Sequence, residues 1–161
     1  MYIPFEEMPD HARIWIYQSN RKLSNEEVAV AEKMLMEFTK DWAAHATPLQ
    51  SSFIIKYNRF IILAVDQEVH PSSGCSIDAS VGVIQELEKQ FGVDLMDKMN
   101  VTFRTGAFIA YKNLADFKKM AKEKSVSAET IVFNNLVNDV GEFKEFWEVP
   151  AMDSWHGRFF K

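Results

Sequence analysis

Cys75 is the only cysteine of this chain, and it stands where a polar loop leads from a strongly apolar segment into a helix. Asp66 and His70 precede it on the same connection. A thiol near a helix N-terminus feels the positive end of the helix dipole, which lowers its pKa and favours the nucleophilic thiolate. In such a site Cys75 would act as nucleophile or ligand, His70 as base and Asp66 as the group that orients the base. The alternative is that Cys75 is a small apolar residue that fills the core.

The same side chains, together with His45, supply nitrogen, oxygen and sulfur atoms of the kind that bind transition metals. Their spacing does not support a metal site, because the chain contains no H-x-x-x-H, C-x-x-C or H-E-x-x-H motif. We therefore expect no bound metal and no cofactor.

Three further polar residues are candidates for ligand binding. Asp78 lies near the expected start of a helix, where capping and the helix dipole also explain an acidic residue. His45 falls on the apolar face expected for the first helix, where a histidine usually satisfies its ring nitrogens within the fold. Arg59 would bind an anion if it converged with Arg13 and Arg21, and solvent-exposed arginines are the alternative.

The end of the sequence combines aromatic and cationic side chains, a composition that suits a protein interface. These residues are Trp155, His156, Arg158, Phe159 and Phe160. They would equally suit a terminal segment that packs on its own domain, because the aromatic side chains need burial in either case. The sequence leaves both alternatives open.

The elements that would position these residues follow from the spacing of the apolar side chains. Residues 12–18 form a β-branched and aromatic run that predicts a strand. Ser24 and Glu27 form a capping box at the start of a first helix, and Pro48 is expected to end it. The helix presents one apolar face, made by Val28, Ala31, Leu35, Phe38, Trp42 and His45.

Residues 53–65 are too many for one ordinary strand and predict two arms joined by a turn at residues 58–59. The second arm is apolar at every position, which predicts a central strand buried on both faces. A second helix spans residues 76–91 and ends at Gly92. Small residues form a stripe along it at Cys75, Ala79 and Gly82. Such a stripe indicates that another backbone or a ligand approaches this side closely.

Residues 100–104 and 107–111 predict a hairpin, Asn113 caps a short third helix, and residues 130–133 predict a last strand. The order is β-α-β-β-α-β followed by β-α-β. The first six elements match a ferredoxin-like split β-α-β plan, an α+β fold in which two helices cover one face of an antiparallel sheet. We expect this core at residues 1–98 and a C-terminal β-α-β extension with an aromatic tail at residues 99–161, as a separate lobe or as part of one continuous domain.

The chain has 161 residues and a net charge of −5, with 18 Lys or Arg against 23 Asp or Glu. Both signs are mixed along the chain without a Lys/Arg block, which argues against a nucleic-acid partner and against direct membrane contact. One cysteine cannot form an internal disulfide, and no apolar stretch reaches membrane-spanning length. Because the first residues also lack the pattern of a signal peptide, we expect a cytoplasmic protein.

Several segments make the chain similar to an uncharacterised bacterial family of similar length. The likeness covers nearly the whole chain and includes the segments WIYQSNRKL, YNRFIILAVD, SGCSIDAS, TIVFNNLV and SWHGRF. Members of that family are often labelled ABC transporter ATPases. Such ATP hydrolysis needs a phosphate-binding loop of the form G-x-x-x-x-G-K-[ST]. The six glycines of this chain never make that spacing, so ATPase activity is not predicted.

Residues 101–151 also resemble a GYF-type domain. The resemblance lies in a hairpin, the helix NLADFKKMAKEK, the segment SAETIVF and a tryptophan followed by Pro150 and Ala151. It implies a domain that binds proline-rich or other short peptides on an aromatic surface. The GYF triplet is missing from this chain, so the resemblance concerns the fold alone.

Taken together, these features predict a non-enzymatic binding or assembly module. It would act as a homodimer or with a protein or peptide partner, through an open sheet edge and the aromatic C-terminal segment. The alternative hypothesis is a small thiol-dependent enzyme or ligand-binding protein, with a pocket around Cys75, His70 and Asp66.

Overall fold

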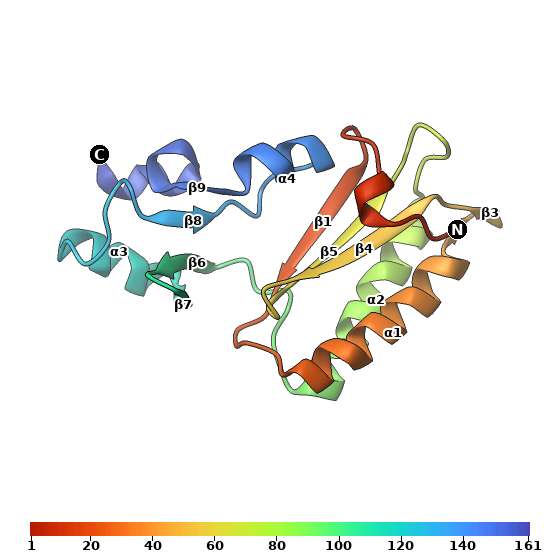
Figure 1. Cartoon of the computed structure of the whole chain (residues 1–161), viewed down its shortest axis with the longest axis horizontal. Coiled ribbons are helices and arrows are strands. Elements are labelled where there is room, and N and C mark those ends of the chain that lie inside the picture. The colour runs from red at the N-terminus through yellow and green to blue at the C-terminus, as the bar shows by residue number, and fades with distance from the viewer. The chain divides into compact units, whose positions relative to one another are not determined.

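The computed structural model describes all residues, 1–161, and contains two compact units (Figure 1). Unit 1 comprises Met1–Met96 and Asn138–Gly141, and unit 2 comprises Asp97–Val137 and Glu142–Lys161. Helices and antiparallel sheets make the chain an α+β protein. The first boundary falls after Met96 rather than after the expected residue 98, and the segment Asn138–Gly141 from the second half of the chain also belongs to unit 1.

The elements of the two units follow one another along the chain with short connections. Up to residue 96 they are η1 (Phe5–Glu7), β1 (Arg13–Gln18), α1 (Asn25–Asp41), β2 (Ala43–Ala44), β3 (Thr47–Pro48), β4 (Ser51–Lys56), β5 (Phe60–Val65) and α2 (Gly74–Phe91). The later elements are β6 (Asn100–Thr105), β7 (Phe108–Asn113), α3 (Leu114–Lys122), β8 (Ile131–Phe133), α4 (Val140–Phe146), β9 (Glu148–Pro150), η2 (Ala151–Asp153) and η3 (Trp155–Phe160).

The main sheet of unit 1 has the strand order β1-β5-β4, and both pairs are antiparallel. All six residues of β5 are buried, as the apolar run predicted, so both faces of this central strand are covered. The turn from β4 to β5 has positive φ at Tyr57 and Asn58, which confirms a tight turn and places it one residue earlier than expected. This arrangement supplies three of the four strands of a split β-α-β plan.

The fourth strand of the ferredoxin-like plan is not in this sheet, which corrects the expectation. β6, the strand expected there, pairs with β7 and β8 in the sheet of unit 2. A short segment takes its place beside β1. The N–H of Ile14 donates to the carbonyl of Asn138 at 3.0 Å, and the N–H of Val140 donates to the carbonyl of Ala12 at 3.0 Å. These bonds satisfy polar groups on an edge that would otherwise be open.

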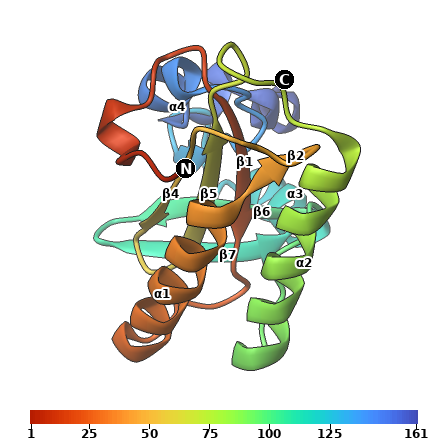
Figure 2. The same ribbon diagram turned by 90° about the vertical axis from the view of Figure 1, so that its right-hand side faces the viewer.

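Helices α1 and α2 lie side by side on one face of the β1-β5-β4 sheet (Figure 2). The capping box predicted at Ser24 and Glu27 is present. Helix α2 begins at Gly74, two residues before the expected start, and Ser73 is its N-cap. Gly92 ends the helix as predicted, in the left-handed conformation with a φ of 64°. The core beneath them is formed by Tyr17, Leu23, Ala31, Leu35, Phe53, Ile61, Leu63, Ile84, Leu87, Val93 and Leu95.

Helix α1 ends earlier than its apolar periodicity predicted, and His45 is therefore not on a helix. The backbone turns extended at Trp42, whose carbonyl accepts the N–H of Leu49 at 2.9 Å and thereby closes the β2–β3 hairpin. His45 and Ala46 form the tip of this hairpin with φ values of 51° and 65°. The apolar periodicity continues beyond Asp41, but the bonds of Trp42 to Leu49 and Ser76 hold its backbone extended and end the helix.

Unit 2 contains an antiparallel sheet with the order β7-β6-β8-β9. The predicted cap of α3 is confirmed, because the side chain of Asn113 accepts the N–H of Asp116 at 2.8 Å. Its core consists of Val101, Phe103, Phe117, Val126, Val132, Val149 and Ala151. The sequence did not predict α4, β9 or the two short helices at the end. No helix of either unit combines the length and the apolar character that crossing a membrane requires.

Candidate functional site

The expected thiol site does not form a connected cluster. Cys75 is exposed as the second residue of α2. Nδ1 of His70 lies 2.9 Å from the carbonyl oxygen of Pro71. The carboxylate of Asp66 lies 3.1 Å from Nε2 of His11. The backbone N–H of His70 donates to the carbonyl of Asp66 at 3.5 Å, but no side-chain hydrogen bond or ion pair joins Cys75, His70 and Asp66, and their catalytic roles stay a prediction.

His11 is the partner of Asp66 that the sequence did not indicate. Its Nε2 lies 3.1 Å from Oδ1 of Asp66 and 3.2 Å from Oε2 of Glu68. The two carboxylates also share the turn after β5, because Oδ1 of Asp66 accepts the N–H of Glu68 at 3.1 Å. These contacts tie the segment before β1 to the loop before α2. No group of three or more His, Cys, Asp or Glu side chains is arranged to hold a metal ion.

The candidate ligand-binding residues Asp78, His45 and Arg59 are not brought together by any recorded contact. Asp78 is exposed on α2, and His45 is exposed at the β2–β3 turn. Arg59 is buried, and its Nη1 donates to the carbonyl of Ser19 at 3.1 Å.

Arg13 and Arg21 do not join Arg59 around an anion either. Nη1 of Arg13 donates to the side chain of Asn138 at 2.6 Å. Arg21 makes two hydrogen bonds of 2.8 Å to Glu27, which lower the pKa of that carboxyl to about 2. The three guanidinium groups thus hold separate parts of the fold.

The C-terminal aromatic residues pack on unit 2, which is one of the two alternatives that the sequence left open. The side chains of Trp155, Phe159 and Phe160 pack against the core around Phe117. The rings of Phe159 and Phe160 meet that of Phe117 at 5.8 and 6.2 Å. Arg158 is exposed, with its guanidinium 5.6 Å from the ring centre of Trp155.

His156 is the most buried member of this C-terminal cluster, with 1% of its surface exposed. Its Nδ1 lies 2.6 Å from Oγ of Ser154, and its ring stacks on Trp155 at 3.8 Å. Burial, and secondarily the charge of Arg158, lowers the pKa of His156 to about 4. The ring is therefore neutral near pH 7 and serves as a core residue rather than as an exposed contact.

A groove with a mostly apolar lining lies between α1 and α2. It has a volume of about 530 Å³, a size that is usual for binding sites. Most of its lining is apolar and comes from the facing sides of the two helices and the start of β2. The lining residues are Met34, Glu37, Phe38, Asp41, Trp42, Ala43, Ala79 and Val83.

The helices that form this groove are joined at both ends. At one end the indole N–H of Trp42 donates to the carbonyl of Ser76 at 2.8 Å, in a buried bond. At the other end Arg21, in the loop before α1, bonds to Glu27 of α1, and its Nη2 donates to the carbonyl of Phe91 at 2.8 Å. The ring of Trp42 also packs on Phe38 at 4.9 Å, so the floor of the groove is fixed. Such a preformed site loses little conformational entropy when it binds a partner.

Of the predicted stripe of small residues, Ala79 lines this groove and Gly82 lines a second hollow of α2. Ala79 is part of the α2 wall of the groove, where its small side chain leaves room. A Cβ atom added at Gly82 would meet nothing within 4 Å. At Gly82 the stripe thus faces open space rather than a second backbone.

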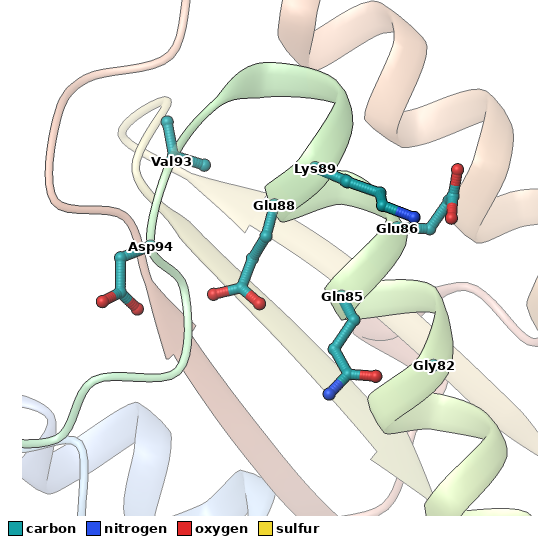
Figure 3. A pocket seen from close by; sticks show the side chains of 7 residues that line it. All are labelled: Gly82, Gln85, Glu86, Glu88, Lys89, Val93 and Asp94. Carbon is teal, nitrogen blue, oxygen red and sulfur yellow. The ribbon is translucent and has the colours of Figure 1, made fainter.

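A second hollow of about 670 Å³ lies along another side of α2, near Val93 and Asp94. Gln85, Glu86, Glu88 and Lys89 of α2 all line it (Figure 3). Two of its three acidic residues already accept backbone hydrogen bonds. Glu88 accepts the N–H of Leu95 at 2.8 Å, and Asp94 accepts the N–H of Met96 at 3.0 Å. Such bonds stabilise the loop after α2 and leave the apolar groove as the stronger candidate.

No protein-family model, curated protein or solved structure matches this chain. The functional assignment therefore depends on the geometry of the chain itself.

Proposed function

We propose that this protein is a non-enzymatic binding module that accepts an apolar side chain of a short protein segment in the α1–α2 groove. The observation that carries the proposal is an apolar groove with a fixed aromatic floor, between helices joined at both ends. A helix pair of this kind offers the surface used in helix-in-groove recognition. A reducing compartment such as the cytoplasm suits the module, because Cys75 is exposed and unpaired.

This proposal moves the contact surface away from the C-terminal residues. The rings of Phe159 and Phe160 contribute to the core of unit 2, so a partner could use them only at the expense of that core. Phe38 and Trp42, in contrast, border a hollow that the chain leaves unfilled. An apolar surface that its own chain does not cover is the more informative indication of a partner.

Nuclear magnetic resonance of the full ¹⁵N-labelled chain tests the proposal. Titration with N-acetyl-leucinamide and N-acetyl-tryptophanamide should shift the amides of Met34, Phe38 and Ala79 and the indole N–H of Trp42. The variant Ala79→Phe should fill the groove and remove these shifts. Ala29→Phe is the matched control, because Ala29 is an exposed residue of α1 that does not line the groove.

Two results would contradict the groove as a docking site. One is that neither compound shifts groove resonances at millimolar concentration, and the other is that Ala79→Phe behaves like Ala29→Phe. Light scattering of the same samples reports the oligomeric state, which separates a partner of another kind from a second copy of the chain.

A further inference from the structure

We infer that the segment bound in the α1–α2 groove is basic and amphipathic, with an apolar anchor flanked by Lys or Arg. This inference rests on the proposed function and adds the chemistry of the partner. The lining contains two carboxylates, Glu37 and Asp41, and no cationic side chain. Both residues are exposed, so a cation that reaches either carboxylate forms an ion pair at the solvated rim of the groove, beside the apolar lining.

The charge of the surroundings has the same sign. Unit 1 contains 15 Asp or Glu residues and eight Lys or Arg residues, a formal charge of −7, whereas unit 2 contains eight acidic and ten basic residues, a formal charge of +2. The acidic character of the whole chain is therefore concentrated in the unit that carries the groove. Such a field attracts basic partners and repels acidic ones during encounter.

The cations of unit 1 near the groove are few. Lys33 and Lys40 each precede a lining residue by one position, about 100° around the helix from it, and neither lines the groove. The α-ammonium of Met1 lies near Asp41. The charge of Asp41 raises the pKa of this ammonium, but burial lowers that pKa by more. The ammonium already donates to the carbonyls of Leu49 and Thr39, so it does not cover the apolar floor.

The length of the apolar surface sets the length of the partner. Val30 is 37% exposed and lies one turn before Met34, which in turn lies one turn before Phe38. The three side chains extend over nine residues of α1. The eight steps between the first and the last correspond to about 12 Å at about 1.5 Å per step. That distance matches about two turns of a partner helix, with apolar side chains at every third or fourth position and cations at its borders.

Three peptides of about 14 residues test this chemistry. They share the same Leu positions at helical spacing, and their remaining positions are Lys, Gln or Glu. Titrated into the ¹⁵N-labelled full chain, the Lys peptide should shift the groove amides and the Trp42 indole with an affinity at least about tenfold above that of the Glu peptide. Raising the salt concentration from about 0.05 M to about 0.5 M should weaken binding of the Lys peptide and reduce the difference in affinity between the Lys and Glu peptides.

A charge reversal in the rim gives the decisive comparison. The double variant Glu37→Lys and Asp41→Lys should lose the preference for the Lys peptide and gain binding of the Glu peptide. The double variant Glu6→Lys and Glu32→Lys changes the net charge equally at exposed residues outside the groove, and it should keep most of the original preference. If both double variants respond alike, the preference comes from net charge and the inference about the rim is wrong.

The remaining outcomes separate this inference from the function that it extends. Equal binding of the three peptides at the groove would overturn the basic partner and leave the groove as a docking site. Absence of groove shifts with every peptide, together with a negative result for the small apolar compounds, would overturn both. Concentration-dependent groove shifts without peptide would identify a second copy of the chain as the occupant and would also overturn the basic partner.

Discussion

The aromatic side chains around Phe117 in unit 2 and those around Trp42 in unit 1 have different neighbours. Phe117 is enclosed by residues from the end of the chain, among them Phe159 and Phe160. Phe38 and Trp42 line a groove that no other segment fills. Trp42 is itself only 3% exposed, so the two clusters differ in whether the surface beside the rings stays open, and aromatic content alone does not identify a docking surface.

The largest effect is expected at the covered cluster. Phe117→Ala removes a fully buried ring that meets Phe103 at 5.3 Å and should lower the free energy of unfolding by about 3–5 kcal/mol. Phe38→Ala should cost clearly less, because the side chain of Phe38 is only partly buried. Urea unfolding of both variants measures the difference. If both variants lost the same free energy of unfolding, the two aromatic clusters would be equally closed and the contrast drawn between them would be wrong.

The second prediction concerns the pH dependence that the covered cluster confers. Because the pKa of His156 is lowered to about 4, the unfolded chain takes up a proton below about pH 6.5 that the folded chain does not. The contribution of His156 to the free energy of unfolding should therefore decrease as the pH falls from about 6.5 to about 4, by roughly 3 kcal/mol at most. Unfolding free energies across this interval should fall less steeply in His156→Gln.

His45→Gln is the control for this pH series, because His45 is exposed at the β2–β3 turn. It should leave the slope of stability against pH unchanged. A slope that persists in His156→Gln would show that other groups cause the acid sensitivity.

The third prediction concerns the fixed floor of the open groove. Trp42→Phe removes the indole N–H that donates to the buried carbonyl of Ser76 and should cost about 1–3 kcal/mol. It should also loosen the end of the groove, so hydrogen exchange should become faster in the first turn of α2. Unchanged exchange there would mean that the bond does not hold the helix pair together.

The smallest effect is expected at Gly82, and its sign is opposite. A Cβ atom at this position meets nothing within 4 Å, so Gly82→Ala should stabilise α2 by up to about 1 kcal/mol. Gly92→Ala is the contrasting variant, because its φ of 64° makes a side chain unfavourable and the same substitution should destabilise. Thermal unfolding of the two variants should therefore shift in opposite directions.

Local signals in the sequence predicted the local structure well. The capping box at Ser24 and Glu27 and the cap at Asn113 need only residues three positions apart, and all are present. The turn near Asn58 and the end of α2 at Gly92 likewise depend on the backbone preferences of single residues. These features do not require knowledge of which segments meet.

The features that the sequence did not predict depend on contacts between distant residues. His11 and Asp66 are 55 positions apart, and the indole of Trp42 bonds to a carbonyl 34 positions away. The second of these bonds accompanies the early end of α1, which removed His45 from the helix. The groove follows from the spacing of two helices, and no motif in one segment encodes such a spacing.

The bridge between Asn138 and β1 has a consequence for how the protein is made. The ribosome releases Met1–Met96 about 40 residues before it releases Asn138–Gly141, so the first unit emerges with one strand edge incomplete. During that interval the unsatisfied backbone of Ile14 can pair with another nascent chain. A protease cut or a gene fusion placed between the two halves would make this transient exposure permanent.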